Sequence, residues 1–450
     1  MLNLSTPICD FVNKYSAEGI SRFHMPGHKG VNFHGTEKLD ITEIKGADYL
    51  FEPEGIIAQS EAQMSAAFGT AKTLYSTEGS SLCIKAMLGI VNQTRRDKSD
   101  KMLVIAPRNV HKAFINACIL LDIEVFWVYP ARQSVSICAS EITPEDIKKA
   151  LTDCPRRPDC VYVTSPDYLG NLCDIKEISE ICHREDVSLL CDNAHGAYLN
   201  FLEKSLHPMA LGADMCCDSA HKTLPCYTGG ALLHISKSAP EEFSKCAKNV
   251  MSLFASTSPS YLIMQSLDMC GDYLGKSYKA DLAETVRRVG ICKERITSCG
   301  WKLCGDEPCK ITVCANDSGF EGNELGDRLR GYGIGPEYTD FKYVVLMITP
   351  FNSEEDFLRA ERAFSEIPQP KIRVCFEECE IPKAKVRMGI RQAAFSDFRT
   401  VPVDKAEGKI CAMTVTCCQP SVPVVISGEE ITAEVIKILK KYSIYEINVL

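Results

Sequence analysis

The sequence lacks a long apolar run, a surplus of basic residues and a leader-like start, and each absence removes a class of protein. No uncharged apolar run approaches the ~20 residues of a membrane-spanning helix. The formal net charge is −9, which argues against general binding to nucleic acid backbones. Residues 1–7 have no charged segment followed by an apolar core, so we expect no secretion signal. We therefore expect a soluble cytoplasmic protein that binds neither nucleic acid nor membrane.

Cysteine is abundant, but its spacing lacks the patterns of zinc sites and disulfide frameworks. Of the 24 cysteines, Cys216–Cys217 and Cys417–Cys418 are adjacent pairs and many others lie in apolar stretches. One series recurs at regular intervals: Cys299, Cys304, Cys309 and Cys314. Its spacing differs from the C-x2-C pattern of common metal ligands, so a metal site is the minor alternative. We predict no metal, and free thiols in a reducing cytosol.

The 450 residues are enough for a large core and roughly two or three domains. Residues 1–60 read as irregular. From about 60 to 240, short apolar runs alternate with stretches of helical period, for example Ile175–Arg184. This alternation predicts an α/β fold with a mostly parallel sheet. The expected strands are Met102–Ala106, Val125–Tyr129, Cys160–Thr164, Ser188–Cys191, Asp214–Cys217 and Ala231–Ile235. After about residue 300 the pattern changes to smaller α+β domains.

Lys222 and Asp192 are the most informative residues. Lys222 follows Asp192 by about thirty positions, a separation that one strand–helix–strand unit covers. If each residue ends a buried strand, both lie at the carboxyl edge of the sheet, where such sheets bind ligands. A lysine and a carboxylate suit pyridoxal phosphate: the lysine binds its aldehyde as a Schiff base, and the carboxylate keeps the pyridine nitrogen protonated. Taken singly, a helix-capping aspartate and a solvated lysine are equally good interpretations.

Two further segments fit such a cofactor. The run Ser76–Ser81 precedes the helix-like stretch Leu82–Ile90 and offers backbone N–H groups and hydroxyls to a phosphate. An ordinary helix cap explains the same run, and the carboxylate of Glu78 must point away if a phosphate binds there. His111 follows a strand and opens a helix, so its ring could lie on the cofactor; the alternative is a histidine in water at a helix start.

With these residues in place, the chain resembles the Orn/Lys/Arg decarboxylases, specifically the short bacterial forms. The motifs that carry the resemblance span nearly the whole chain: Phe23–His28, Thr77–Ser81, Asn109–Lys112, Asp192–Ala197, Ser219–Pro225 and Ser256–Tyr261. The resemblance implies the fold of aspartate aminotransferase, that is, a fold-type-I enzyme dependent on pyridoxal phosphate. It divides the chain into an N-terminal segment near a subunit interface (1–60), a cofactor-binding large α/β domain (61–298), a small α+β domain (299–368) and a C-terminal decarboxylase subdomain (369–450).

The resemblance also implies roles for individual residues. Those expected to bind the cofactor are Lys222, Asp192, Ala194, His111, Gly79, Ser80, Ser81, Ser219 and Thr257. Lys222 makes the covalent link, Asp192 pairs with the ring nitrogen, and Ala194 and His111 lie on the two faces of the ring. The serines and Gly79 hold the phosphate, to which Thr257 reaches from a neighbouring subunit. The expected catalytic residues are Lys222, Asp192, His111 and His221, which lies beside the lysine.

The activity implied is α-decarboxylation of arginine, lysine or ornithine to agmatine or a diamine, by a homodimer with shared active sites. Two alternatives stay open: another reaction on the same scaffold, such as transamination or aldol-type cleavage, and a non-catalytic regulatory relative. Cys418–Pro423 departs from the family motif that borders the substrate site, which puts the substrate in doubt. The carboxylates considered for the substrate side chain are those of Asp48, Glu54 and Glu337.

Overall fold

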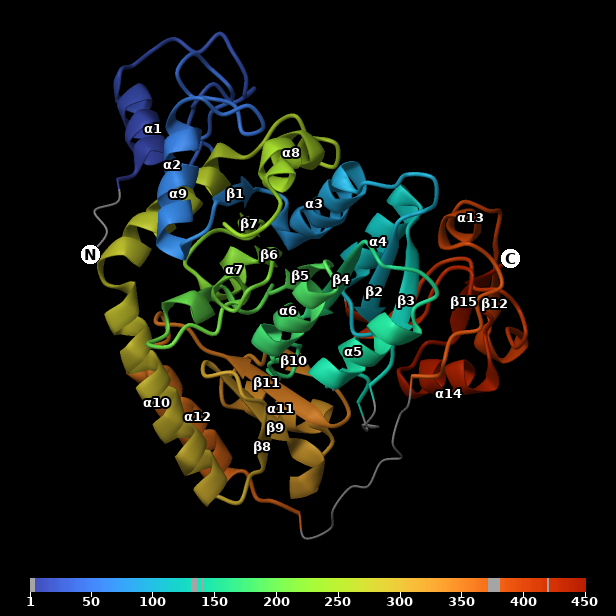
Figure 1. Cartoon of the computed structure of the whole chain (residues 1–450). Coiled ribbons are helices and arrows are strands. Elements are labelled where there is room, and N and C mark those ends of the chain that lie inside the picture. The colour runs from blue at the N-terminus through green and yellow to red at the C-terminus, as the bar shows by residue number, and fades with distance from the viewer. Residues whose placement is uncertain (1–4, 131–135, 139–140, 371–380, 419–420) are drawn as a thin grey trace. The chain divides into compact units, whose positions relative to one another are not determined.

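The computed structural model describes residues 5–130, 136–138, 141–370, 381–418 and 421–450. The chain forms two compact units. Figure 1 labels the helices and strands. Unit 1 comprises Met1–Asp100, Asp159–Tyr162 and Ile175–Lys279, and unit 2 comprises Lys101–Pro158, Val163–Asp174 and Ala280–Leu450. The division into four segments expected from the sequence stays a prediction.

A seven-stranded, mostly parallel sheet has the strand order β1-β7-β6-β5-β4-β2-β3. Its strands are β1 (Lys72–Ser76), β2 (Leu103–Pro107), β3 (Glu124–Val128), β4 (Cys160–Thr164), β5 (Ser188–Asp192), β6 (Met215–Asp218) and β7 (Ala231–Ile235). Strands β5 and β6 are parallel, as are β2 and β3, whereas β7 runs antiparallel to both β6 and β1. This confirms the expected α/β class, and each expected strand agrees with its observed counterpart to within one residue at either end.

Burial explains why these strands were visible in the sequence. Every residue of β2, β6 and β7 is buried, so both faces of the sheet are covered. A strand buried on both faces reads as a continuous apolar run. The longer helices of unit 1 are α1 (Pro7–Ala17), α2 (Ile56–Phe68), α3 (Gly79–Thr94), α6 (Ile175–Arg184), α8 (Glu241–Ser252) and α9 (Tyr261–Lys276). Helix α6 has the bounds expected from its period.

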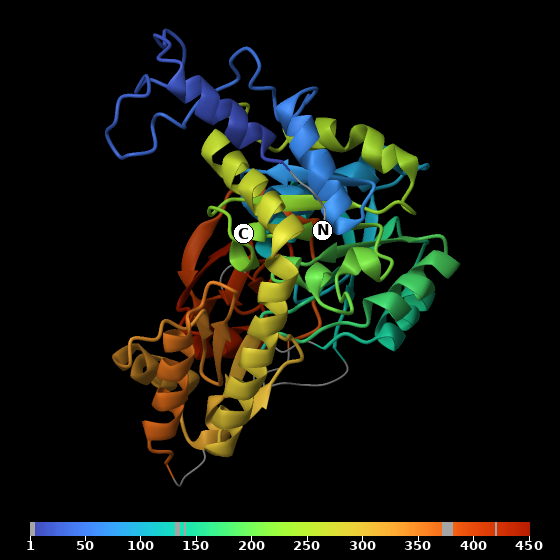
Figure 2. The same ribbon diagram turned by 90° about the vertical axis from the view of Figure 1, so that its left-hand side faces the viewer.

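The N-terminal segment contains a helix, so the expectation that residues 1–60 are irregular is wrong. Helix α1 begins at Pro7 and packs on α2 and α9 (Figures 1 and 2). The backbone N–H groups of Ile8 and Cys9 donate to Oδ2 of Asp268 on α9, at 3.0 and 3.1 Å. The first N–H groups of a helix have no partner within the helix, and Asp268 satisfies two of them. A carboxylate some 260 positions away therefore stabilises this helix.

In unit 2 a smaller sheet has the order β10-β11-β9-β8 and is antiparallel at every pairing. The strands are β8 (Leu303–Cys304), β9 (Lys310–Cys314), β10 (Tyr338–Thr339) and β11 (Tyr343–Met347). Helices α10 (Tyr278–Ser298), α11 (Gly322–Gly331) and α12 (Glu354–Glu366) pack around a core that includes Trp301 and Phe364. Helices α10 and α12 lie side by side (Figures 1 and 2), and Arg288 joins them through ion pairs with Glu354 and Glu361.

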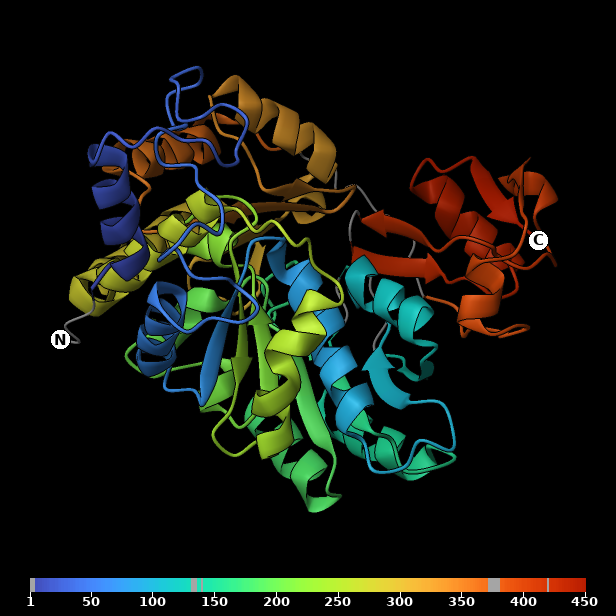
Figure 3. The same cartoon turned by 90° about the horizontal axis from the view of Figure 1, so that it is seen from above.

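Unit 2 also contains α4 (Lys112–Leu121), α5 (Pro144–Asp153) and the C-terminal elements. The latter are α13 (Ile390–Ala394), β12 (Arg399–Pro402), β13 (Val415–Cys418), β14 (Ser421–Val425), α14 (Ala433–Lys441) and β15 (Glu446–Val449). Strands β13 and β14 form an antiparallel pair, and α4 contacts both α13 and β14 (Figure 3). Within the departing motif, Gln419 and Pro420 lie outside the described residues.

The structure also bears on two expectations from the composition, which concern membrane-spanning helices and free cysteines. Among the helices in the described part of the chain, none is long and apolar enough to span a membrane. The cysteines in the same part of the chain are free thiols, and most of them are buried. Burial raises the pKa of many of these thiols, for example that of Cys83 to about 12, so they stay protonated near neutral pH.

Candidate active site

Asp192 ends strand β5, and three donors hold its carboxylate. Oδ2 accepts a hydrogen bond from the phenol of Tyr162 at 3.2 Å. Oδ1 accepts from the backbone N–H of Ala194 at 3.2 Å and from the thiol of Cys217 at 3.6 Å. Burial, together with the charge of Asp192, raises the pKa of Tyr162 well above its usual value, so the phenol stays a donor. The carboxylate is therefore oriented at the carboxyl end of a parallel strand, the edge where such sheets bind ligands.

Lys222 lies beyond the end of β6 in the one-turn helix α7 (Ala220–Thr223), not at the end of the strand itself as expected. The helix follows Ser219, whose carbonyl accepts from the N–H of Lys222 at 2.9 Å. Nζ of Lys222 is 3.0 Å from Nε2 of His195, a contact in which a protonated amine donates. The structure thus brings the lysine amine to the segment that begins with Asp192.

The serines predicted to bind phosphate also meet. Gly79 starts helix α3 with a φ of +70°, a conformation that side chains disfavour. The hydroxyl of Ser219, just after β6, donates to the hydroxyl of Ser80 in the first turn of α3 at 2.6 Å. Ser81 follows in the same turn. Two hydroxyls and a helix N-terminus therefore share one place in unit 1, and they suit an anion.

Glu78, the residue whose charge conflicts with a phosphate, has a partner within the chain. Its Oε1 accepts from the backbone N–H of Ser256 at 2.7 Å. The neighbouring Phe254 ring lies under Nζ of Lys85 on α3, with 5.8 Å between the nitrogen and the ring centroid. The segment that carries Thr257 therefore begins beside helix α3 of its own chain. Thr257 itself is exposed.

His221 precedes Lys222, and the geometry of its ring determines which nitrogen carries the proton. Both its backbone N–H and Nδ1 lie within 3.1 Å of the Gly230 carbonyl, so Nδ1 donates. In the neutral ring, Nε2 then has a lone pair and no proton. Burial lowers the pKa of His221, and the charge of Lys222 lowers it further. His221 is therefore neutral near pH 7 and has no proton to give from Nε2.

His111 belongs to unit 2, where it caps helix α4. Its Nδ1 accepts from the N–H of Ala113 at 3.0 Å. This hydrogen bond gives the ring one orientation relative to the first turn of the helix. The role of His111 on the cofactor stays a prediction.

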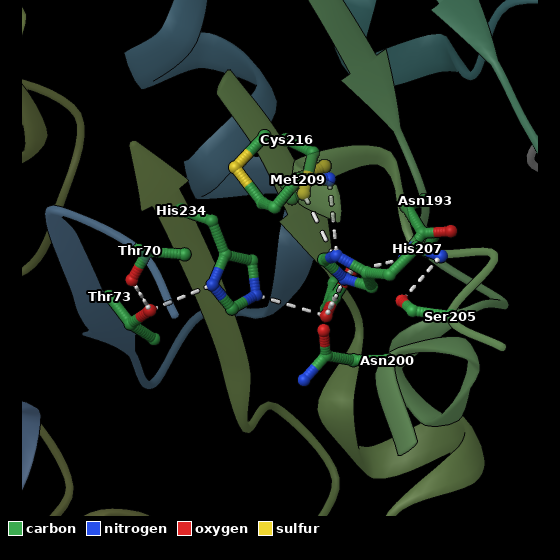
Figure 4. Close-up of polar contacts among 12 residues, drawn as sticks. Thr70, Thr73, Asn193, Asn200, Ser205, His207, Met209, Cys216 and His234 are labelled. Atoms are coloured by element: carbon green, nitrogen blue, oxygen red, sulfur yellow. Dashed lines mark hydrogen bonds and ion pairs between the residues drawn. The ribbon is translucent and has the colours of Figure 1, made fainter. Parts of the chain in front are cut away.

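A buried network lies next to the site in unit 1 (Figure 4). The carboxylate of Asp218, the last residue of β6, accepts from Nε2 of both His207 and His234 at 3.0 Å. It also accepts from Nδ2 of Asn193 at 2.6 Å. Burial alone would raise the pKa of Asp218, but the two histidines outweigh that effect and hold it well below its usual range. The network therefore connects the strand before Lys222 to the residue after Asp192.

The same network includes Cys216, so its residue types could bind a metal. The hydrogen bonds favour another interpretation. Nδ1 of His207 accepts from the N–H of Met209 at 3.3 Å, so the ring proton of the neutral histidine is on Nε2. A metal-binding histidine usually coordinates through one nitrogen and donates from the other, whereas here the other nitrogen accepts. The contacts are those of a hydrogen-bonded network around a buried carboxylate.

Several of these residues were not predicted from the sequence as parts of the site. His195 lies in the motif Asp192–Gly196, three residues after Asp192. This short separation from a predicted site residue could have indicated that His195 also belongs to the site. Tyr162 and Cys217 lie in apolar strands and gave no signal. The structure brings several of the predicted residues of unit 1 together. Ser219 contacts Ser80, and Lys222 contacts His195. His195 belongs to the same segment as Asp192 and Ala194, which bond to each other.

Comparison with known proteins places this arrangement in a family. A profile of the family described as "Orn/Lys/Arg decarboxylase, major domain" matches residues 6–324. The chain is 28% identical to an arginine decarboxylase of Bacillus subtilis, over 97% of this chain and 93% of that protein. It is also 28% identical to an arginine decarboxylase of Bacillus anthracis, with 97% and 92% covered.

Solved structures share the fold. The structure of the lysine decarboxylase LdcF of Francisella novicida aligns with a TM-score of 0.79 at 16% identity, covering 100% of this chain and 81% of that one. The constitutive lysine decarboxylase of Escherichia coli aligns with a TM-score of 0.78, also at 16% identity, covering 100% and 82%. The chain belongs to the Orn/Lys/Arg decarboxylase family and is an amino acid decarboxylase for a basic substrate.

Proposed function

We propose that the protein uses pyridoxal phosphate to decarboxylate arginine, which yields carbon dioxide and agmatine. The observation that carries the cofactor assignment is the set of groups gathered in unit 1. A buried, oriented carboxylate, a lysine amine and a pair of serine hydroxyls at a helix start match the ring nitrogen, aldehyde and phosphate of this cofactor. When bound, the cofactor withdraws electrons from the α-carbon of the substrate.

Individual residues of the chain have separate roles in the reaction. Asp192 keeps a proton on the ring nitrogen, and Tyr162 and Cys217 hold its carboxylate in place. Lys222 would hold the cofactor through its aldehyde carbon. In the overall reaction the α-carboxylate of the substrate leaves as carbon dioxide, and a proton takes its place on the α-carbon. Lys222 is the better proton donor, because His221 is neutral and its one ring proton is bonded to Gly230. Preorganised charge at the ring should carry most of the rate.

The remaining predicted contacts complete the proposed site. Gly79, Ser80, Ser81 and Ser219 hold the phosphate at the start of helix α3. By the family resemblance, Ala194 and His111 would lie on the two faces of the ring. His195 keeps the amine of Lys222 in position, since the two nitrogens are in hydrogen-bond contact. Membership of a decarboxylase family argues against transamination and aldol-type cleavage. The presence of both Lys222 and Asp192 argues against a purely regulatory role, which would need neither.

Arginine is proposed as the substrate because four relatives that match at least 95% of the chain are named arginine decarboxylases. Of the carboxylates considered for its side chain, Asp48 is the least suitable. It accepts from five backbone N–H groups, including those of Glu54 and Gly55 at the start of α2. Burial raises its pKa and these bonds lower it, with a net decrease, so Asp48 acts as a helix cap. Glu54 and Glu337 are exposed and stay candidates.

Incubation with single amino acids tests the proposed substrate. We expect the purified protein, supplied with pyridoxal phosphate, to release carbon dioxide and agmatine from arginine with a higher kcat/KM than from lysine or ornithine. Carbon dioxide and the amine are measured together, because transamination would form neither product. A higher kcat/KM for lysine or ornithine would contradict the choice of arginine while leaving the reaction type intact.

We also propose a homodimer in which residues 1–60 lie at the subunit interface. In that segment Phe23 is 96% exposed and Phe33 83% exposed. Clusters of large apolar side chains in water are typical of interaction surfaces. The family resemblance adds that Thr257 reaches the phosphate of the partner. The contact between Ser256 and Glu78 of the same chain favours the alternative, in which the segment serves its own subunit.

Mixed dimers distinguish these two arrangements. We expect Lys222→Ala and Thr257→Trp chains, each inactive alone, to recover up to half of the wild-type activity per active-site pair when mixed. If Thr257 serves the partner, both defects fall on one site of the mixed dimer and the other site is intact. If Thr257 serves its own chain, every site keeps one defect. Subunit exchange is checked with differently tagged chains, and exchange without recovery would rule out the shared site.

A further inference from the structure

A buried ion pair connects the C-terminal part of the chain to the loop before His111. Arg108 directly follows strand β2 and is fully buried. Its Nη1 donates to Oε1 of Glu429 at 2.6 Å, and its Nη2 donates to Oε2 at 3.2 Å. Nη2 also donates to the Val424 carbonyl at 3.3 Å, and the guanidinium lies over the ring of Trp127, 4.9 Å from its centroid. The forked guanidinium is therefore held in one geometry.

The turn Ser427–Glu429 presents the carboxylate of this pair. Gly428 has a φ of +93°, and a side chain there would place its first carbon 2.3 Å from the carbonyl oxygen of Met388. Only glycine fits, so the turn is specified by the sequence. Oε2 of Glu429 also accepts from the N–H of Ile426 at 2.9 Å. Glu429 is thus oriented by its own turn as well as by Arg108.

Two further contacts hold the same region of unit 2. The carbonyl of Val110, the residue before His111, accepts from the N–H of Val422 at 3.2 Å. At the other end of helix α4, Nη1 of Arg391 donates to the carbonyl of Leu120 at 2.6 Å. The C-terminal elements therefore contact both ends of the helix that His111 caps (Figure 3).

We propose that the pair Arg108–Glu429 positions His111, so that the C-terminal subdomain shapes the cofactor site without touching the cofactor. This inference rests on the proposed role of His111 beside the ring. The ring direction of His111 follows from its backbone, because Nδ1 is bonded to the N–H of Ala113. Removing one member of a buried pair leaves the other charge uncompensated and is strongly destabilising. We therefore expect the loss of this pair to displace the short loop between Arg108 and His111, which is three residues away.

The test uses Glu429→Gln, which keeps the shape of the side chain and removes its charge. Pyridoxal phosphate is titrated into the cofactor-free protein, and absorbance and visible circular dichroism report binding and ring environment. We expect about tenfold weaker binding and a changed dichroism band. Glu361→Gln is the matched control, since Glu361 on α12 pairs with Arg288 at 2.6 Å and its side chain is 10% exposed, against 6% for Glu429. It should lower Tm and leave cofactor binding unchanged.

A double-mutant cycle with His111→Ala shows whether the effect passes through His111. We expect Glu429→Gln to add nothing to the binding loss of His111→Ala. Additive losses would overturn the inference. An unchanged affinity in His111→Ala would overturn it as well, and would remove His111 from the proposed site, whereas covalent trapping at Lys222 tests the proposed function independently. If Glu429→Gln does not fold, Arg108→Lys keeps the charge but loses the forked contact, and the same two outcomes apply.

Discussion

Replacing Lys222 by alanine is expected to abolish both activity and covalent binding of the cofactor. Alanine has no amine to bind the aldehyde carbon and none to return a proton to the substrate. Borohydride reduction followed by peptide mapping should label Lys222 in the wild-type protein and give no labelled lysine in the variant. The absorption band of the covalently bound cofactor should disappear with it.

The fold of this variant should survive, because Lys222 is only half-buried. Far-UV circular dichroism and Tm check this. Lys245→Ala is the matched control, since Lys245 lies on the surface of α8 and pairs with the exposed Glu241 in the same helix. It should retain trapping and activity. Labelling of any lysine other than Lys222 in the wild-type protein would contradict the central assignment.

Asp192→Asn is expected to leave the cofactor bound and to slow turnover about a thousandfold. A neutral amide cannot keep the proton on the ring nitrogen, so the cofactor withdraws electrons less strongly. A loss of ~4 kcal/mol in transition-state stabilisation corresponds to that factor, at about 1.4 kcal/mol per tenfold. Stopped-flow and steady-state measurement of carbon dioxide release give kcat, and absorbance titration gives cofactor affinity.

The amide has the same shape as the carboxylate, so Tyr162 and Cys217 can still contact it and the site should stay folded. Asp186→Asn is a suitable control, because Asp186 is exposed and has a φ of +53°, which asparagine also tolerates. The control should have normal kcat. A near-normal kcat for Asp192→Asn itself would rule out its proposed role at the ring nitrogen.

Much of the fold could be predicted because the central strands are buried on both faces. Strand β7 (Ala231–Ile235) and helix α6 (Ile175–Arg184) were expected with their observed bounds. A fully buried strand leaves a continuous apolar run, and a surface helix leaves a 3.6-residue period. Edge strand β1 (Lys72–Ser76) was not predicted, because it is not a continuous apolar run. Lys72 and Thr73 are polar, and they bond to Ser244 and His234, which lie far away in sequence.

In the candidate site, too, some features follow from local sequence and others depend on tertiary contacts. Asp192, Lys222 and Ser80 could be predicted, since each lies in a short motif with its own chemistry at the end of an element. The helical position of Lys222 and its contact with His195 could not, because neither follows from a local pattern. Helix α1 is a similar case, as its first N–H groups depend on Asp268.

The local sequence therefore determined the order of the helices and strands and the chemical groups that they carry. It indicated which runs are buried, which turns need glycine and which residues have an amine or a carboxylate. Tertiary packing alone decided which distant groups meet. Asp218 on β6 receives hydrogen bonds from Asn193, His207 and His234, because the fold brings three separate parts of the chain to this strand. Arg108 likewise meets a carboxylate 321 positions later. A buried charge must find its partner wherever the fold provides one, and no short stretch of sequence records that choice.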